Sequence, residues 1–288
     1  MPEGDTIYRT ARALGRAMSG RRVLGFASRM AEVARADDER AFAGECVVRV
    51  ESRGKWLLMV LAPAGEDDET RQRILATHML MSGSWHVYRR GEAWQKPRDQ
   101  ARIVVETDEY EEAGFRVPIA KVYTWVQLRR ERKIPRVEED LLRAEFDAEA
   151  AVKRLLACDR KSVGEAMMNQ RVMAGVGNVF KSEVCFVERV SPFAPVSELS
   201  EVQARALVER SRKLLQANVL ENSGDRIVTY RGRQRRMTRN ADPGANLWVY
   251  GRRGEACRRG GSAIERALQG DGARVTYWCP VCLATGGK

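Results

Sequence analysis

The 288-residue chain is long enough for two domains of ordinary size, because single hydrophobic cores seldom grow beyond about 250–300 residues. Its 44% hydrophobic and 31% charged residues are typical of a globular protein and exclude a fibrous or wholly disordered chain. The formal net charge of +11 favours a polyanionic partner, nucleic acid before a membrane surface, although a well-solvated basic enzyme would share this charge.

We expect neither a membrane span nor a signal peptide. No stretch approaches the roughly 18 apolar residues of a span, and the polar residues 1–5 are unlike a signal sequence. The protein is therefore expected in the cytoplasm or nucleoid, without a membrane partner. It is also expected to be a monomer. In a reducing compartment Cys46, Cys158 and Cys185, which lie among apolar neighbours, are expected to be buried thiols.

The first 130 residues are predicted to be mainly β-structure after one short helix. Apolar residues at helical spacing from Asp5 to about Ser19 predict that helix. Segments rich in β-branched and aromatic residues then predict seven short strands, over 47–50, 55–61, 74–78, 84–88, 103–106, 115–117 and 121–126. Short strands joined by tight turns favour an antiparallel sandwich or barrel.

The rest of the chain is predicted to be helical up to a small finger. Capping boxes at Ser162 with Glu165 and at Ser200 with Gln203 precede apolar runs. An Arg-rich tract, residues 230–239, is expected to be a loop that pairs with phosphates. We expect a β-domain over 1–130, a linker over 131–147, a helical domain over 148–245 and a finger over 246–288.

Two glycines and an asparagine, Gly175, Gly177 and Asn178, lie between two predicted helices. Glycines allow a close approach to a phosphate, and Asn178 as a cap would leave free N–H groups at a helix start. This pattern indicates an anion site for a nucleic-acid backbone. An ordinary turn between helices has the same sequence pattern.

Cys257, Cys279 and Cys282 indicate a metal knuckle near the carboxyl end. The last two form a C-x₂-C pair, but the position that should complete the first pair is Gly260. Two interpretations stay open. Zn²⁺ is bound by three cysteines with water or a carboxylate such as Asp271, or the finger is a metal-free hairpin. We expect less than one zinc per chain unless a non-cysteine ligand substitutes.

Five motifs follow one another along the chain: Pro2-Glu3-Gly4-Asp5-Thr6-Ile7, Gly54-Lys55, Gly175-Val176-Gly177-Asn178-Val179 with Lys181-Ser182-Glu183, Val249-Tyr250-Gly251-Arg252, and Arg274-Val275-Thr276-Tyr277-Trp278-Cys279. In their order and spacing the chain resembles the formamidopyrimidine-DNA glycosylase/endonuclease VIII family, from residue 2 to about 282. The resemblance implies an α+β fold. It combines an N-terminal two-sheet antiparallel β-sandwich with a C-terminal helical domain that has a helix-two-turn-helix and a zinc-finger-like β-hairpin.

The resemblance implies a bifunctional DNA glycosylase/AP lyase of base excision repair that attacks with its amino-terminal proline. Met1 must then be removed so that the Pro2 nitrogen can attack C1′ of the damaged nucleotide. An α-amino group has a pKa of about 7.7–8.0 against about 10.4 for lysine, so more of it is nucleophilic at neutral pH. The iminium that forms drives β,δ-elimination of the strand.

The resemblance also implies roles for charged residues near the nucleophile. Glu3 matches the general acid/base, and Lys55 matches the lysine that holds a phosphate and assists base loss. Without the family pattern, both would be interpreted as exposed charges at a helix start and at a turn.

The implied partner is damaged duplex DNA, clamped between the two domains. Gly177 and Asn178 from the helix-two-turn-helix and Arg274 from the hairpin match the backbone clamps. Leu80 and Met81 match the wedge loop, with Met81 as the intercalating side chain. The alternative is that Leu80 and Met81 belong to the core at a strand end.

Two departures indicate the endonuclease VIII-like branch, whose members favour oxidised pyrimidines and abasic sites. Gly4-Asp5-Thr6 resembles that branch, and the segment 115–118 lacks the Asp-x-Arg-Arg-Phe-Gly pattern of the 8-oxoguanine branch. Two rival functions stay open. A non-catalytic damaged-DNA-binding paralogue would keep the clamp alone, and an RNA-binding protein would use a degenerate zinc ribbon.

Overall fold

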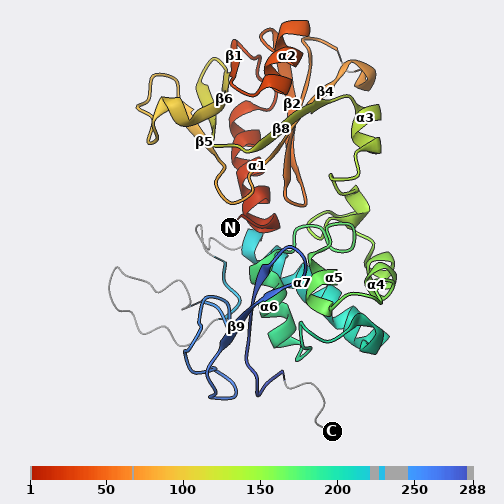
Figure 1. Cartoon of the computed structure of the whole chain (residues 1–288). Helices are drawn as coiled ribbons and strands as arrows, with labels where there is room; N and C mark the ends of the chain where they lie inside the picture. The colour runs from red at the N-terminus through yellow and green to blue at the C-terminus, as the bar shows by residue number, and fades with distance from the viewer. Residues whose placement is uncertain (1, 67, 221–226, 231–245, 284–288) are drawn as a thin grey trace. The chain divides into compact units, whose positions relative to one another are not determined.

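A computed structural model describes residues 2–66, 68–220, 227–230 and 246–283 (Figure 1). The chain divides into two units, residues 1–136 (unit 1) and 137–288 (unit 2). Most of the Arg-rich tract, from 231 onward, lies outside the described residues. None of the helices in the described ranges is long and apolar enough to cross a membrane. The four domain ranges expected from the sequence stay predictions.

Unit 1 contains two four-stranded antiparallel sheets, as predicted. The first has the order β1 (Gly25–Ser28), β6 (Ala101–Glu106), β7 (Tyr110–Phe115) and β5 (Ser84–Arg89). The second has the order β2 (Glu45–Arg53), β3 (Trp56–Pro63), β4 (Arg73–His78) and β8 (Ile119–Tyr123). Two short 3₁₀ turns, Glu69–Arg71 and Arg98–Gln100, lie between strands.

The strand β3 is apolar on both faces because both are buried. Leu57, Met59 and Leu61 belong to the main core of unit 1, whereas Leu58 and Val60 face a second cluster on the other side of the sheet. A run of this kind has no period-two alternation, which is typical of a strand covered on both faces.

Helix α1 (Gly4–Met18) closes the main core of unit 1. Ile7, Ala11, Leu14 and Met18 are all buried in that core, which confirms the helical spacing seen in the sequence. Burial of such side chains contributes about 1.5–3 kcal/mol for each large one, so this face attaches α1 firmly to the sheets.

Several elements of unit 1 differ from the prediction, and the predicted strand 115–117 shares only Phe115 with β7. Strand β1 and helix α2 (Ala31–Glu39) were not predicted, because β1 is short and only Val33 of α2 is buried. The predicted strand 121–126 ends at Tyr123, since Thr124 and Gln127 form a capping box that starts α3 (Trp125–Arg130).

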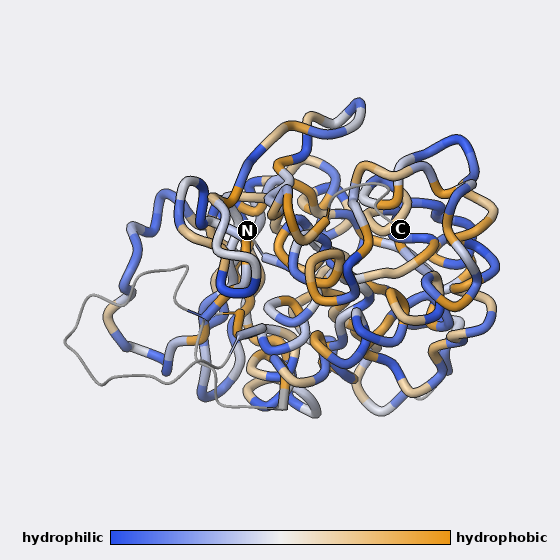
Figure 2. The backbone as a smooth tube through the Cα atoms, turned by 90° about the horizontal axis from the view of Figure 1, so that it is seen from below, coloured by the Kyte–Doolittle hydropathy of each residue, from blue (hydrophilic) through white to orange (hydrophobic). Residues whose placement is uncertain are grey.

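Unit 2 is helical and ends in a hairpin, as predicted. Its helices are α4 (Ala148–Leu156), α5 (Val163–Met168), α6 (Asn178–Val187) and α7 (Glu201–Leu220), with 3₁₀ turns at Val137–Glu139 and Val196–Glu198. Both predicted capping boxes are present. The hairpin pairs β9 (Glu265–Gln269) with β10 (Arg274–Trp278). In Figure 2, hydrophilic residues occupy many of the outer loops.

The buried helix α6 lies at the centre of unit 2. Phe180 and Val184 belong to the helical core, and Phe186 packs with Val249 and Cys279 under the finger. Of the scattered cysteines, Cys185 on α6 is buried as expected, whereas Cys46 and Cys158 are only half-buried.

Candidate functional site

The amino end of α1 lies at the same end of unit 1 as the turn between β2 and β3 (Figure 1). The Gly20 N–H donates to the Val47 carbonyl at 2.7 Å, and a Cβ atom on Gly15 would lie 3.6 Å from the Val50 carbonyl oxygen. Helix and strand therefore run alongside each other, and residues nearer the start of α1 lie nearer the end of β2. The start of the chain thus approaches the turn after β2.

The first described residues put an acidic side chain at the start of α1. Glu3 is the N-cap residue and is fully buried, while Pro2 is half-buried. The partial positive charge of the first-turn amides favours a carboxylate there. Asp5 is also buried, which raises its pKa, and the nearby Arg9 guanidinium opposes that shift. The alternative that Glu3 is an exposed surface charge is therefore wrong.

Lys55 lies in a two-residue hairpin turn between β2 and β3. Arg53 and Trp56 pair across the turn, and Gly54 has a φ of 58°, as the first position of a type II′ turn requires. Lys55 is half-buried, so it is not a fully solvated turn residue. Burial, and after it the positive charge of Lys55, lower the pKa of His78 to about 4. Lys55 and His78 are therefore close neighbours.

The loop after β4 exposes two apolar side chains. Met81 is 72% exposed and Leu80 is 44% exposed, so the alternative that they are core residues is wrong. His78 Nδ1 accepts the Leu80 N–H at 3.1 Å, and Leu80 adopts a φ of 45°. No role was predicted for His78, although this imidazole fixes the first bend of the loop. A histidine at a strand end was the available signal.

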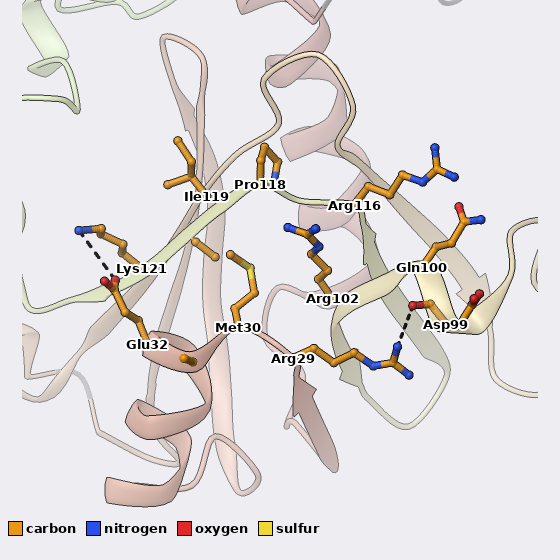
Figure 3. Close-up of a pocket in the computed structure, with 12 residues that line it drawn as sticks. Arg29, Met30, Glu32, Asp99, Gln100, Arg102, Arg116, Pro118, Ile119 and Lys121 are labelled. Carbon is orange, nitrogen blue, oxygen red and sulfur yellow. Dashed lines mark hydrogen bonds and ion pairs between the residues drawn. The ribbon is translucent and has the colours of Figure 1, made fainter.

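A basic pocket of about 600 Å³ lies beside that loop (Figure 3). Its charged lining residues are Arg29, Arg102, Arg116, Lys121, Glu32 and Asp99. Pro118, also in the lining, would lie 3.2 Å from a Cβ on Gly83 in the exposed loop, which makes pocket and loop neighbours.

The four basic and two acidic side chains in its lining give the pocket a net positive charge. Arg29 donates to the Asp99 carbonyl and Arg102 to the Val117 carbonyl, and these bonds hold both guanidinium groups in the lining. The pocket combines three separate segments of the chain, and no spacing in the sequence indicated it.

In unit 2 the side chain of Gln170 holds the loop before α6. Its amide donates to the Met168 and Val176 carbonyls and accepts the Gly175 N–H, all at 2.9 or 3.0 Å. Gly175 has a φ of 103°, which a residue with a side chain adopts only with strain. Gln170 was missed because its partners became evident only in the folded loop.

The N-cap of α6 is Gly177, not Asn178 as predicted. Asn178 is the first helical residue, because Gly177 has the extended backbone of a cap. The Asn178 side-chain oxygen is buried and has no hydrogen-bond partner within the described part of the chain. A buried acceptor of this kind is available to a hydrogen-bond donor.

The hairpin of the finger is attached to α5 and α6 by buried polar groups. Lys181 Nζ donates to the Val275 carbonyl at 3.1 Å and to Thr276 Oγ1 at 2.7 Å. Thr276 Oγ1 donates to Gln269, whose amide donates in turn to Ser162 Oγ at 2.9 Å. A pocket of about 190 Å³ next to this network is lined by Lys161, Lys181 and the exposed Arg274, among others.

The carboxylate of Glu183 attaches residues 248–250, at the start of the finger, to α6. It accepts the backbone N–H groups of Trp248, Val249 and Tyr250 at 2.8 to 2.9 Å, together with the Thr229 hydroxyl. Burial raises the pKa of Glu183, and these four donors oppose that shift. The motif Lys181-Ser182-Glu183 therefore holds the finger, a role that the sequence did not reveal.

The three cysteines of the finger converge as predicted. The sulfur atoms of Cys257, Cys279 and Cys282 all lie within 4.8 Å of one another, and the described residues contain no other such group of histidine, cysteine or acidic side chains. Backbone N–H groups of Arg259 and Gly260 point at Cys257 Sγ, at 3.4 and 3.3 Å. Amides directed at sulfur stabilise thiolates, as in a metal knuckle.

Asp271 is not part of this cluster, which corrects one of the two interpretations of the sequence. It lies in the turn after β9, whereas Cys279 follows the far end of β10. Burial opposes ionisation of Cys279, but the Ser262 hydroxyl and the Cys282 N–H outweigh it and lower the pKa of this thiol to about 7.

Comparisons with known proteins agree with this geometry. The N-terminal domain model of formamidopyrimidine-DNA glycosylase matches residues 1–118, and the H2TH domain model of the same enzyme matches residues 138–229. A probable endonuclease 8 2 from Streptomyces coelicolor is 37% identical over 99% of the chain and 94% of its own length. The chain belongs to the formamidopyrimidine-DNA glycosylase/endonuclease VIII family.

Within this family, the chain falls in the endonuclease VIII-like branch. The protein named DNA-(apurinic or apyrimidinic site) lyase Nei2 from Mycolicibacterium smegmatis is 35% identical over 98% of both chains. Among solved structures, a Lactococcus lactis formamidopyrimidine-DNA glycosylase mutant in complex with Fapy-dG-containing DNA has a TM-score of 0.77. It covers 99% of this chain and 100% of its own at 19% identity, and so supports the fold.

Proposed function

We propose that the protein is a bifunctional DNA glycosylase/AP lyase of base excision repair whose nucleophile is the Pro2 nitrogen. The observation that supports this most is the buried Glu3 directly after Pro2 at the start of α1, at the end of unit 1 that also holds Lys55. A relative of nearly equal length is named a DNA-(apurinic or apyrimidinic site) lyase. Removal of Met1 exposes the secondary amine that this chemistry needs.

The neutral Pro2 amine attacks C1′ of the damaged nucleotide, and the bond from C1′ to the base breaks. The base leaves with a proton, the sugar ring opens at its oxygen, and the proline nitrogen becomes a positively charged iminium. This cation acidifies the C2′ proton, whose loss expels the 3′ phosphate. A second elimination expels the 5′ phosphate.

Glu3 and Lys55 assist the reaction in different ways, Glu3 by transferring protons and Lys55 by its positive charge. The Glu3 carboxyl group, adjacent to the nucleophile, protonates the ring oxygen and then takes the C2′ proton. Lys55 holds a phosphate near the lesion and assists loss of the base. Its turn is rigid, because Gly54 fixes the bend and Trp56 anchors the next strand in a second core.

We propose that unit 2 binds the DNA backbone. The first-turn N–H groups of α6 after Gly177 suit a phosphate at a helix start, and the NH₂ group of Asn178 would be the side-chain donor to it. Arg274, exposed at the start of β10, supplies a second cation to the backbone. Several structural neighbours were solved with damaged DNA, which agrees with damaged duplex DNA as the partner.

The exposed loop of unit 1 fills the gap that a flipped nucleotide leaves. Met81, the most exposed of its apolar side chains, enters the base stack, with Leu80 beside it. The adjacent basic pocket receives phosphates of the DNA strand, because Arg102 and Arg116 lie at its rim.

The substrate class is inferred from the branch. Relatives named endonuclease 8 2 share 35% and 37% identity with this chain, which supports the endonuclease VIII-like branch, and the resemblance to that branch implies oxidised pyrimidines and abasic sites as substrates. In the finger, Cys257, Cys279 and Cys282 would hold zinc, while Lys181 and Glu183 attach the hairpin to α6. Zinc has no chemical part in the reaction.

Borohydride trapping on abasic-site duplex tests the proposal. Borohydride reduces an iminium to a stable amine, so the mature protein is expected to form a covalent adduct with DNA. Inserting one glycine ahead of Pro2 turns its nitrogen into an amide and should abolish the adduct, as should Pro2→Gly. Mass spectrometry of the active material should find no initiator methionine.

A folded protein that forms no adduct would overturn the enzyme proposal. Tight binding of damaged duplex without cleavage would instead identify a non-catalytic paralogue. Stronger binding of single-stranded RNA than of abasic duplex would identify an RNA-binding protein.

A further inference from the structure

Gly260 faces the three thiols of the finger. A Cβ atom placed on Gly260 would lie 2.8 Å from Cys282 Sγ and 3.7 Å from Cys279 Sγ. A side chain at this position would therefore project directly into the thiol cluster. The Cys282 sulfur occupies that direction and must shift to admit a Cβ atom, whereas Gly260 adds no side chain to the cluster and is itself exposed.

The spacing of the thiols fits a tetrahedral metal ion. The sulfur atoms of Cys257 and Cys282 are 3.8 Å apart. Two thiolates at about 2.3 Å from a tetrahedral Zn²⁺ have a mutual distance of about 3.8 Å. The three cysteines would thus supply three of the four ligands of a tetrahedral Zn²⁺, and the residue that faces the remaining position is Gly260.

We propose that the finger binds one Zn²⁺ through Cys257, Cys279 and Cys282 and leaves the fourth coordination position, opposite Gly260, open to an exchangeable ligand from solution. That ligand is water in the resting protein, and a small soft or nitrogen donor, such as a thiol or an imidazole, can replace it. The inference depends on zinc binding by the finger and does not depend on the glycosylase chemistry.

Ser262 is the protein group that competes for this role. Its hydroxyl lies 3.1 Å from Cys279 Sγ, where it stabilises the thiolate by a hydrogen bond. A hydroxyl that donates to a coordinated sulfur is an outer partner of the metal and is not a ligand. Removing it should weaken zinc binding and leave the fourth position as it was.

The finger tolerates a loosely held metal because other groups attach it to α6. Glu183 accepts three backbone N–H groups from 248–250, and Lys181 holds β10. These bonds do not involve the cysteines. Zinc is therefore expected to exchange without unfolding unit 2.

Cobalt substitution of the full-length protein tests the open position. Co²⁺ at a three-thiolate site should give a tetrahedral absorption spectrum that changes when imidazole or a small thiol is added. In Gly260→Cys the fourth corner is filled by a thiolate, so the spectrum should resist both additions. Gly272→Cys adds a thiol at the hairpin turn, away from the cluster, and should respond like the unmodified protein.

Zinc affinity provides a second measurement. In competition with a chromophoric chelator, Gly260→Cys should bind zinc about 10–100-fold more tightly than the unmodified protein, and Gly272→Cys should not. Near-ultraviolet circular dichroism of the metal-free protein should stay native, because Glu183 and Lys181 keep the finger attached.

Two results would overturn the inference. One is that the unmodified protein takes up no Co²⁺ or Zn²⁺ in excess metal, and the other is that its cobalt spectrum is unchanged by added ligands until Ser262→Ala is introduced. The second result would make Ser262 the fourth ligand. Loss of borohydride trapping would affect the proposed function alone, because these readouts need no DNA.

Discussion

The carboxyl group of Glu112 lies in the main core of unit 1 without a hydrogen-bond partner among the described residues. It pairs across the sheet with Val87 and with the fully buried Val105, so its side chain points into apolar surroundings. Burial raises its pKa to about 8, and Arg21 opposes the shift only weakly. The acid is therefore mostly protonated at neutral pH.

Stability should consequently fall as the pH rises. The folded protein holds the Glu112 proton more tightly than the unfolded chain, where the pKa is near 4.5. The free energy of unfolding should therefore decrease between about pH 4.5 and about pH 8, by a few kcal/mol. Urea unfolding across this range measures the loss, and Glu112→Gln should flatten the curve. An unchanged slope in that variant would contradict the assignment.

Met81 offers a second prediction for a single side chain. Met81→Ala should lower kcat/KM on a base lesion roughly 10–100-fold, because nothing then fills the stack. The loss on an abasic site should be smaller, since no base must be extruded there. The melting temperature should stay unchanged because the side chain is exposed. Equal losses on both substrates would argue against the wedge role.

Local segments of the chain depend on single amide side chains for their shape. Gln170→Ala removes three hydrogen bonds from the loop before α6 and should cost about 1–3 kcal/mol of stability. It should also weaken binding of damaged duplex, because the loop orients Gly177 and Asn178. Band-shift titration measures the affinity.

Gln127→Ala is the matched control for this experiment. Gln127 closes the capping box of α3 in unit 1, so its loss also removes a side chain that holds local backbone. A comparable fall in stability with unchanged DNA affinity is expected. If both variants lose affinity equally, the effect comes from general destabilisation.

The same segments show what could be predicted from the sequence. The spacing of Ile7, Ala11, Leu14 and Met18 predicted α1, and capping boxes predicted the starts of α5 and α7. Periodicity identifies the buried face of an element but not its polar partner. Contacts such as Glu183 with residues 248–250 join segments about 65 positions apart and were therefore invisible.

Across the whole molecule, positive charge is the property most relevant to the proposed partner. The double variant Arg102→Gln with Arg116→Gln should make the plot of log binding constant against log salt concentration less steep by about two units. The reason is that each phosphate contact releases about one counterion. Binding titrations at several salt concentrations measure this slope. Arg89 and Arg90 lie at the other end of β5 from the exposed loop, so the same change there should leave the slope unaltered.

The two-unit architecture was predictable because each unit has its own pattern. Strand signals fill the first part of the chain, and helical signals with a cysteine pair fill the second. The candidate site was predicted through the family motifs, which located Pro2, Glu3 and Lys55. The basic pocket could not be predicted, since its three segments come together only in the folded sheets.

The bond from the Leu80 amide to His78 requires an unprotonated Nδ1. The chain has two histidines, and burial with a nearby lysine lowers the pKa of both His78 and His86. The His78 imidazole is therefore neutral near pH 7, where histidine usually acts as the pH switch. In the Glu112→Gln background, an inflection of the lyase rate near pH 7–8 is then expected from the chain's own first nitrogen, and replacing Cys279, whose thiol pKa is about 7, should leave that inflection in place.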